Sequence, residues 1–504
     1  MRVGLRGVVI ALAVAAAAPI VIDANSTPAS ARSEIRLELG DLLFGDERYW
    51  EAIVAFERAK EGARSDQVAR ASRGLLRSLL QVAEFARARQ EAEVLAGVAD
   101  PADAASRTLY ADALWASGLF AEAEAAYRDA LAIDPEAGGA RHGLARGLAA
   151  RGRLEEGLAE AQAAVAAADT PEAHHTLSTI YRRLRRFPEA AEALTAYVDR
   201  LPGTRRTEKA QWARSEVRFL RSFGDRPALD IPPEQAVRMH TIPFRLERDK
   251  VVVRGRINGG PDMDLVIDTG AEQMVLSKPT AERHRIRPIV NTLSAGVGDI
   301  GLRGLEMGRA DSLEIGTLTI RNIPAIIKNP PLSGLPDTRV ENSISPLAFG
   351  MSAIIDYERE QMLVGREIPE EPADVVLPLR FNRLAMVRGV VNQDHPKSFI
   401  VDTGGEVISI SLATANTLGM VPVRHIPLQV FGTSGWDMDA FLLPGVHLAF
   451  DRIQYENFSV VVLNLHRPSA LLGFHIGGIV GHRFLSNYRV TLDLQRSTLR
   501  LTRI

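Results

Sequence analysis

The spacing of hydrophobic residues along the chain changes once, near Phe223. Between about residues 33 and 202 the sequence is rich in Ala and poor in Pro, and its apolar positions recur with the period of a helix. After Phe223, Gly, Pro and β-branched residues become more frequent, and short alternating runs replace the helical period. Spacings of three and four residues are typical of amphipathic helices, and alternation is typical of strands. The pattern therefore predicts a multidomain chain with an all-α front part and an all-β rear part.

The helical part repeats itself. Its clearest unit contains Leu109, Gly118, Phe120, Ala123, Tyr127, Ala130 and Pro135. Phe120, Leu154 and Phe187 occupy equivalent places at spacings of 34 and 33 residues. This period resembles the tetratricopeptide repeat (TPR), in which stacked helix pairs bury a continuous core. The resemblance implies an array over residues 32–222, closed by a capping helix at 205–222.

A TPR array also implies a concave groove that binds a peptide substrate or a partner protein. A rigid spacer or a dimerisation arm remains the alternative for this part of the chain.

The β part contains an internal duplication. Leu265–Gly270 reads Leu-Val-Ile-Asp-Thr-Gly, and Phe399–Gly404 reads Phe-Ile-Val-Asp-Thr-Gly, 134 residues later. Ser277 recurs as Ser411 at the same spacing. The expected divisions are a linker at 223–240, a first lobe at 241–368 and a second lobe at 373–504.

Each copy places Asp-Thr-Gly directly after three strand-forming apolar residues. Gly permits the tight turn that projects the preceding carboxylate from the strand end. The Thr hydroxyl can form a hydrogen bond across to the partner turn. We therefore expect Asp268 and Asp402 to form a catalytic pair. The residues expected to support the two turns are Thr269, Gly270, Thr403 and Gly404.

The two lobes resemble the retropepsin and pepsin family of aspartic proteases, especially the bacterial retropepsin-like domains. Asp268–Ala271 fits the viral-type signature, and Gly478–Gly481 with Phe484-Leu485 resembles the element that braces the active-site turn. The resemblance adds Gly481 to the supporting residues. It implies an acid-protease fold in which two carboxyls share a proton and activate a water molecule. It implies no cofactor and no metal.

Family members cover this pair of carboxyls with flap hairpins. The flap candidates are Gly296, Gly298, Gly301, Gly432, Gly435 and Trp436. The first three glycines also spell the dinucleotide-binding fingerprint, which needs a helix opening at the last glycine. Gly304 and Gly308 follow in a β-rich context instead, which favours the flap. Trp436 could cap a substrate side chain or pack in the lobe.

Two departures from the family pattern carry expectations. Ala271 and Gly405 stand where pepsin-like enzymes tend to carry a hydroxyl, so the carboxyls should be less acidified and activity should extend towards neutral pH. Ser343–Pro346 stands where the bracing glycine of the first lobe is expected, which predicts a distorted first lobe.

The N-terminus has the pattern of an export signal. Arg2 and Arg6 precede the apolar run Val8–Ile22, and Ala29–Ala31 offers small residues for cleavage. The apolar run is shorter than the roughly 20 residues that span a bilayer. A signal peptide at 1–31 and a periplasmic or secreted mature protein are expected, with an uncleaved anchor as the alternative.

Composition excludes several chemistries. The chain has no cysteine, which removes disulfides and thiol catalysis, and its formal net charge of −2 predicts neither nucleic acid nor a membrane surface as a partner. The histidines are expected to be packing or surface residues, at positions 142, 174, 175, 475 and 482.

The sequence thus predicts an aspartic endopeptidase that acts on peptide or protein substrates. One alternative is an inactive protease-like scaffold that only binds peptides. Another is a lobe that pairs with its equivalent in a second chain; the oligomeric state stays open.

Overall fold

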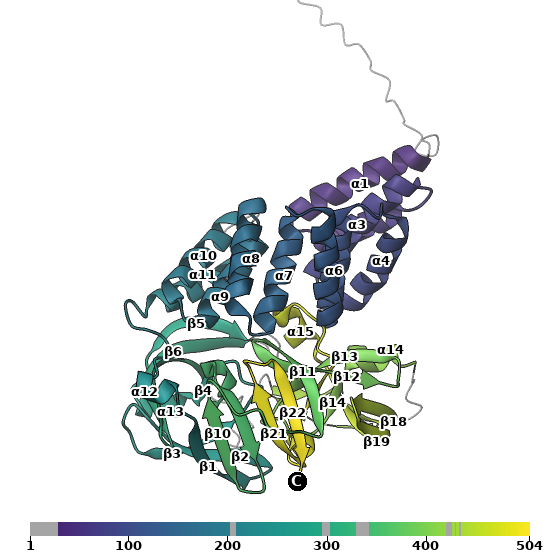
Figure 1. Cartoon of the computed structure of the whole chain (residues 1–504). Helices are drawn as coiled ribbons and strands as arrows, with labels where there is room; N and C mark the ends of the chain where they lie inside the picture. Colours follow the sequence, from purple (N-terminus) through teal and green to yellow (C-terminus); the bar gives the residue numbers. More distant parts are fainter. Residues whose placement is uncertain are drawn as a thin grey trace, which may run out of the picture.

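The structure is a computed structural model that describes residues 29–201, 208–294, 303–328, 342–419, 426–428, 430–432 and 435–504. The described chain forms a layer of helices that lies on a two-lobed β part (Figure 1). Most of the expected signal segment, residues 1–28, lies outside the described residues. Within the described ranges no helix combines the length and the apolar character of a membrane span.

The helical array consists of successive antiparallel helices. They are α1 (Ala29–Gly45), α2 (Tyr49–Ala59), α3 (Ser65–Gln81), α4 (Phe85–Val98), α5 (Ala104–Ala116), α6 (Phe120–Ile133), α7 (Gly138–Ala150), α8 (Leu154–Ala167), α9 (Pro171–Arg183), α10 (Phe187–Arg200) and α11 (Glu208–Arg221). Helices α6, α8 and α10 begin at the three positions that define the sequence repeat. The prediction of a TPR-like helical array is confirmed, and α11 lies where the capping helix is expected.

Small residues allow the helices of the array to approach closely. Ala123 and Ala190 are fully buried. A Cβ atom added to Gly143 would lie 2.1 Å from the ring of Tyr127, which is also fully buried. The alternation of small and large residues in the sequence therefore corresponds to direct contacts between neighbouring repeats.

The two lobes have the same topology. Lobe 1 contains β1 (His240–Glu247), β2 (Lys250–Ile257), β3 (Asp262–Ile267), β4 (Met274–Ser277), α13 (Lys278–Arg283), β5 (Pro288–Ser294), β6 (Arg303–Ile315), β7 (Leu318–Lys328), β8 (Ser343–Ile344), a 3₁₀ turn (Leu347–Phe349), β9 (Ser352–Asp356) and β10 (Gln361–Gly365). Lobe 2 contains β11 (Val375–Asn382), β12 (Leu384–Val391), β13 (His395–Val401), β14 (Ser409–Ser411), α14 (Leu412–Thr417), β15 (Ile426–Pro427), β16 (Val430–Gly432), β17 (Gly435–Asp437), β18 (Phe441–Phe450), β19 (Ile453–Leu463), α15 (His466–Leu472), β20 (Gly478–Val480), α16 (His482–Leu485), β21 (Tyr488–Asp493) and β22 (Thr498–Arg503).

The 134-residue repeat has a structural meaning at Ser277 and Ser411. Each serine precedes a short helix, and its hydroxyl accepts a hydrogen bond from the backbone N–H of Thr280 or Thr414. The repeated serines are therefore N-caps of α13 and α14.

A shared sheet joins the two lobes. Its strand order is β1, β10, β9, β21, β22, β11, with antiparallel pairing throughout. The central pair aligns Ile355 of lobe 1 with Val490 of lobe 2. Because this sheet is continuous, the two lobes pair within one chain.

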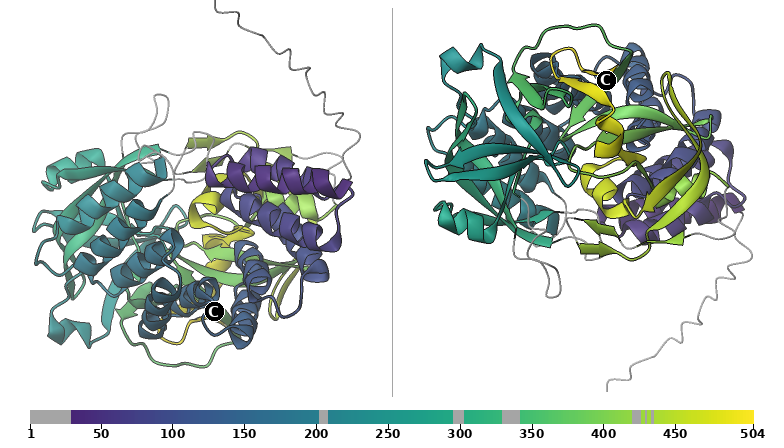
Figure 2. Two further views of the ribbon diagram at one scale, coloured as in Figure 1. Left: turned by 90° about the horizontal axis from the view of Figure 1, so that it is seen from above. Right: turned by 90° about the horizontal axis from the view of Figure 1, so that it is seen from below.

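The helical array docks on both lobes through three equivalent turns, which we call the docking turns, at Gly118, Gly152 and Arg185. Each of these residues has a positive φ, of 78°, 75° and 62°. The carbonyl oxygen of Gly118 accepts a hydrogen bond of 2.7 Å from Ser398 of lobe 2. Arg185 donates to the carbonyl oxygen of Phe349 in lobe 1 at 3.0 Å. Seen from above, the array extends across both lobes (Figure 2).

The expected linker at 223–240 is packed against lobe 1. Leu229 donates a backbone hydrogen bond of 3.1 Å to Asn322, and Asp230 forms an isolated β-bridge with Arg321. Ile231 is 5% exposed and belongs to the core of the lobes. The array is therefore held close to the lobes and is not a separate arm, which argues against the spacer alternative.

Gly152 provides a test of this docking. Its Cβ atom would lie 2.6 Å from the carbonyl oxygen of Leu494, and its φ is 75°. We expect Gly152→Ala to lower the free energy of unfolding by about 1–3 kcal/mol, measured by urea denaturation. The control is Gly97→Ala in α4, where a Cβ meets nothing within 4 Å and Ala favours the helix. Equal stabilities of the two variants would contradict the assigned role of Gly152.

Candidate active site

The two Asp-Thr-Gly turns hold each other through reciprocal hydrogen bonds. The Thr403 hydroxyl accepts from the backbone N–H of Thr269 at 3.1 Å and donates to the carbonyl oxygen of Ile267 at 2.7 Å. The Thr269 hydroxyl does the same in the other direction, with bonds of 3.0 Å to the Thr403 N–H and 2.6 Å to the Val401 carbonyl. Both threonines are buried, so these four bonds are shielded from water.

Glycine is required in both turns because the opposite carboxyl lies against it. A Cβ atom at Gly270 would lie 2.6 Å from Cγ of Asp402, and one at Gly404 would lie 2.7 Å from Cγ of Asp268. Each carboxyl also accepts backbone hydrogen bonds from its own turn, from Gly270 at 3.0 Å and from Gly404 at 2.9 Å. The structure thus brings Asp268 and Asp402 together with the turn residues named from the sequence.

A parallel strand braces each turn from behind. The N–H of Asp402 donates to the Val480 carbonyl at 3.0 Å, and the N–H of Asp268 donates to the Ile344 carbonyl at 2.9 Å. A Cβ atom at Gly481 would lie 2.6 Å from the Val407 carbonyl oxygen, which explains glycine in lobe 2. Lobe 1 keeps the same backbone bond with Ser345 in the bracing region. The expectation that lobe 1 is distorted there is wrong, because the brace is made by the backbone.

The electrostatics of the pair are those of two carboxyls that share a site. Burial raises the pKa of Asp402 to about 7, and the charge of Asp268 and a hydrogen bond with its side chain act in the same direction. The N–H groups of Gly404 and Gly405 oppose this shift by stabilising the carboxylate. The pair therefore retains a proton up to nearly neutral pH.

The flap candidates fall in two groups. Gly296, Gly298 and Gly301 lie outside the described residues, but the flanking strands β5 and β6 pair up to Ser294 and Arg303. A strand begins at Arg303, where a dinucleotide-binding loop would need a helix.

In lobe 2, Gly432 pairs with Gly435, and Phe431 with Trp436, in the hairpin of β16 and β17. The side chain of Trp436 lies outside the described residues, so both interpretations of this residue stay open.

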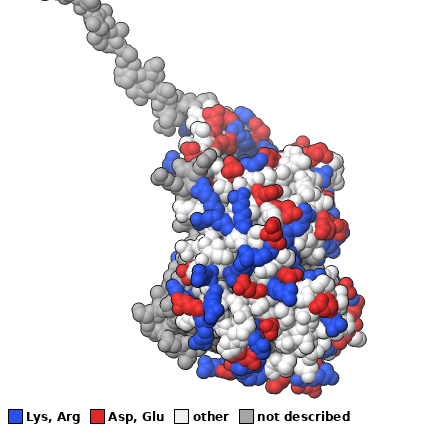
Figure 3. All heavy atoms as spheres, turned by 90° about the vertical axis from the view of Figure 1, so that its left-hand side faces the viewer, with Lys and Arg blue, Asp and Glu red and all other residues white. Residues whose placement is uncertain are grey.

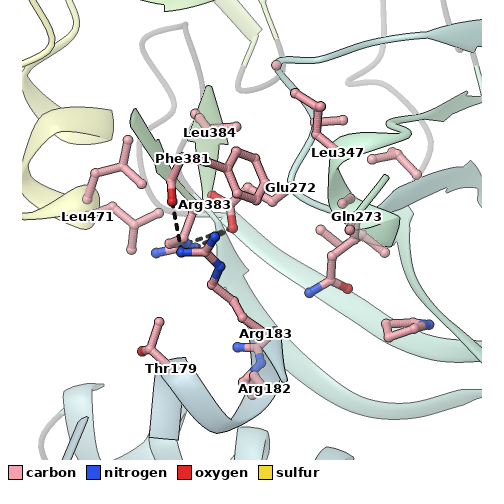
Figure 4. Close-up of a pocket in the computed structure, with 18 of the residues that line it drawn as sticks. Thr179, Arg182, Arg183, Glu272, Gln273, Leu347, Phe381, Arg383, Leu384 and Leu471 are labelled. Carbon is pink, nitrogen blue, oxygen red and sulfur yellow. Dashed lines mark hydrogen bonds and ion pairs between the residues drawn. The ribbon is translucent and has the colours of Figure 1, made fainter. Parts of the chain in front are cut away.

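The carboxyl pair lines a cavity of about 470 Å³ that has three walls. Lobe 1 contributes Gln273 and Leu347, and lobe 2 contributes Leu384. The third wall is the helical array, from which Thr179 and Arg183 reach the same space (Figure 4). The full contribution of the array comprises Gly152, Leu154, His175, Thr179, Arg182, Arg183, Arg185, Phe187, Trp212 and Glu216.

The residues of this third wall were not among the sites predicted from the sequence. The only sequence signal for this wall is a run of four arginines in five residues, Arg182 to Arg186, at a repeat turn. The location of this run beside the carboxyl pair depends on how the array docks on the lobes. Arg383 was missed as well. Its guanidinium pairs with Glu272, two residues after Gly270, at 2.6 Å, and so ties lobe 2 to the turn of lobe 1.

Three of the histidines named from the sequence have structural partners. His475 is hydrogen-bonded to Ser411 at 2.9 Å, and burial lowers its pKa to about 4. His142 contacts Thr176 at 2.9 Å, and His174 contacts Asp169 at 2.7 Å. The described residues contain no group of three or more His, Asp or Glu side chains that could hold a metal ion.

Comparisons with known proteins agree with this division. Residues 253–335 match the family model of a gag-polyprotein putative aspartyl protease, and residues 387–476 match that of an aspartyl protease. Residues 114–180 match a tetratricopeptide repeat. No curated protein was found to match the sequence.

Solved structures resemble the two parts separately. A thermophilic TPR protein of Thermus thermophilus is 21% identical over 37% of this chain and 98% of its own, with a TM-score of 0.32. An aspartic proteinase from Irpex lacteus is 13% identical over 53% of this chain and 97% of its own, also with a TM-score of 0.32.

The fold, the paired turns and the family models together define the class. The chain carries an N-terminal TPR array followed by two aspartyl protease-like lobes. The resemblance inferred from the two Asp-Thr-Gly segments is therefore confirmed.

The reciprocal threonine bonds can be tested by Thr403→Val. This change keeps the side-chain shape but leaves the buried Thr269 N–H and Ile267 carbonyl without a partner. Each of the two unsatisfied groups costs about 1–3 kcal/mol, so we expect a loss of about 2–6 kcal/mol in the free energy of unfolding. Thr403→Ser keeps both bonds and is the control. A stability for Thr403→Val within about 0.5 kcal/mol of Thr403→Ser would contradict the assignment.

Proposed function

We propose that this protein is an aspartic endopeptidase that hydrolyses peptide bonds of peptide or protein substrates. The observation that carries the proposal is the Asp268–Asp402 pair, held in contact by reciprocal threonine bonds on the wall of a substrate-sized cavity. The raised pKa of Asp402 supports the same function, because a pair that shares one proton contains both a general base and a general acid.

In this mechanism the ionised carboxylate takes a proton from a water molecule held between the two aspartates. The resulting nucleophile attacks the carbonyl carbon of the scissile peptide bond. The protonated aspartate donates its proton to the carbonyl oxygen as a tetrahedral intermediate forms. The leaving amine then receives a proton as the C–N bond breaks. The Gly404 and Gly405 N–H groups hold the Asp402 carboxyl in the required orientation.

The helical array has two roles in this proposal. Its last repeats form the third wall of the cavity, so a substrate must enter as an extended segment between array and lobes. Its first repeats offer a second cavity of about 550 Å³, lined by residues of α1, α3, α5 and α7. This groove is the proposed binding place for a partner protein or for a distant part of the substrate.

Export to the periplasm or the medium remains part of the proposal. It rests on the signal-like pattern of residues 1–31. Basic and acidic side chains are interspersed over the array and the lobes on the face seen in Figure 3. This mixture agrees with the proposed absence of a nucleic-acid partner.

The second candidate function is a peptide-binding scaffold without catalysis. The feature that favours it is the helical wall, which narrows access to the carboxyl pair. The two functions differ in turnover, which can be measured directly on a diverse peptide library with the purified chain.

Asp268→Asn and Asp402→Asn test the catalytic pair. Each is expected to lower turnover at least 100-fold, because general acid–base catalysis contributes about 10²–10⁴-fold. Both replacements are isosteric, so circular dichroism should show an unchanged fold. Asp264→Asn, at an exposed position of β3, is the matched control and should keep full activity. Parental turnover in either dyad variant would exclude an intrachain dyad.

The pH dependence follows from the shared proton. With the pKa of Asp402 raised to about 7, the proton is present below this pH and is lost as the pH rises through it. We expect kcat/KM to remain substantial at about pH 6 and to fall above about pH 7, in a peptide-cleavage assay across roughly pH 3–9. A sharp optimum near pH 3 would contradict the expectation.

A further inference from the structure

The wall that the helical array contributes to the cavity is rich in arginine. Arg182 and Arg183 are the last two residues of α9, and Arg185 lies in the turn that leads to α10. All three line the cavity that contains Asp268 and Asp402. Figure 4 shows Arg183 extending from the array towards Phe381 and Arg383 of lobe 2, with Glu272 nearby. The array therefore brings cationic groups into the space where a substrate must lie.

The arginines around the cavity differ in how their charge is balanced. Arg182 pairs with Glu216 at 2.8 Å, and Arg383 pairs with Glu272 at 2.6 Å. Apart from the two catalytic aspartates, these two glutamates are the only acidic residues in the described lining. Arg183 forms no ion pair within the described part of the chain. Its charge therefore has no carboxylate as an ion-pair partner there. Arg185 also forms no ion pair in the described residues, but its guanidinium donates to the carbonyl oxygens of Leu229 and Phe349 on the side of lobe 1.

Arg183 is nevertheless held in a defined position. Its Nη1 atom donates to the carbonyl oxygen of Phe381 at 3.0 Å and to that of Ala149. Its guanidinium carbon lies 5.2 Å from the centre of the Phe381 ring. Burial lowers the pKa of Arg183 to about 10, so the side chain stays protonated at neutral pH. A fixed, desolvated cation of this kind binds an anion strongly, because the orientation is already established.

The anion most available in a peptide-cleaving site is a carboxylate of the peptide itself. We propose that Arg183 binds a carboxylate of the substrate, from an Asp or Glu side chain or from its C-terminus, and thereby determines which peptides enter the site. This inference rests on the proposed function, of which it names the substrate class. In this inference the helical array contributes to substrate specificity, because Arg183 distinguishes acidic from neutral peptides.

The competing explanation is that Arg183 only ties the array to lobe 2. Its two carbonyl contacts belong to α7 and to β11, and removing them would loosen the docking. A purely structural role predicts that acidic and neutral peptides lose affinity alike when Arg183 is replaced. A charge-reading role predicts that only the preference between them is lost.

The experiment uses matched peptides with a reduced amide in place of the scissile bond, so that binding is measured without cleavage. Pairs differ in Glu against Gln, in Asp against Asn, or in a free against an amidated C-terminus. Fluorescence anisotropy with the parent chain should give about 10-fold or tighter binding for one class of carboxylate. The pair that shows the effect separates a side-chain carboxylate from the C-terminal one.

The variants then assign the preference to Arg183. Arg183→Gln should reduce the ratio to within about 2-fold while neutral peptides bind as before, and Arg183→Lys should keep part of it. Arg186→Gln is the matched control, because Arg186 is exposed, pairs with Glu189 at 2.8 Å and does not line the cavity. Its ratio should equal that of the parent.

The outcomes separate the two proposals. Equal binding of every acidic and neutral pair by the parent chain overturns the inference, and so does a uniform loss of affinity in Arg183→Gln. If Arg183→Gln does not fold, the ratio of acidic to neutral peptide affinity is compared between the parent chain and Arg183→Lys. An unchanged ratio in Arg183→Lys would then contradict the inference. Preferential binding of a carboxylate without cleavage of the corresponding normal peptides would support the inference and contradict the endopeptidase. Cleavage of the peptides without any charge preference would support the endopeptidase and contradict the inference about Arg183.

Discussion

The structure depends on the contact between two buried Asp-Thr-Gly turns. Each threonine hydroxyl bonds one backbone donor and one backbone acceptor of the opposite turn and its strand, with distances of 2.6–3.1 Å. Both threonines are buried. Separation of the two turns would therefore leave two backbone N–H groups and two backbone carbonyl groups without their partners. The same exchange presses each carboxyl against the glycine of the opposite turn. The pairing of the lobes and the proximity of Asp268 to Asp402 therefore have one cause.

That proximity accounts for the proton that the pair retains. Two carboxyls in contact cannot both ionise at low cost, and burial adds to the penalty. The N–H groups of Gly404 and Gly405 offset it only in part. No hydroxyl follows the glycine in either turn, since the residues are Ala271 and Gly405. The pKa of Asp402 at about 7 fits this lack of a further donor.

The helical array changes the site from a groove between two lobes into a space with three walls. Its docking turns lie one repeat apart, at Gly118, Gly152 and Arg185, and each contacts a lobe. A repeat architecture thus presents the same turn to the lobes three times. Residues next to the turns at Gly152 and Arg185 line the cavity, and among them Arg183 donates to lobe 2 without a carboxylate as an ion-pair partner in the described part of the chain. In the proposed function, substrate selection and docking therefore share one surface.

The sequence by itself determined the TPR repeats, the duplicated lobes and the pair of aspartates. They follow from the 33–34-residue helical repeat, from the 134-residue duplication and from the Asp-Thr-Gly motif, whose glycine permits a tight turn. The sequence could not show that Ile344 braces lobe 1 without a glycine, because a backbone carbonyl makes that bond. Nor could it show that Arg183 meets Phe381, 198 residues away. Such contacts depend on how the array packs on the lobes, which only the tertiary structure decided.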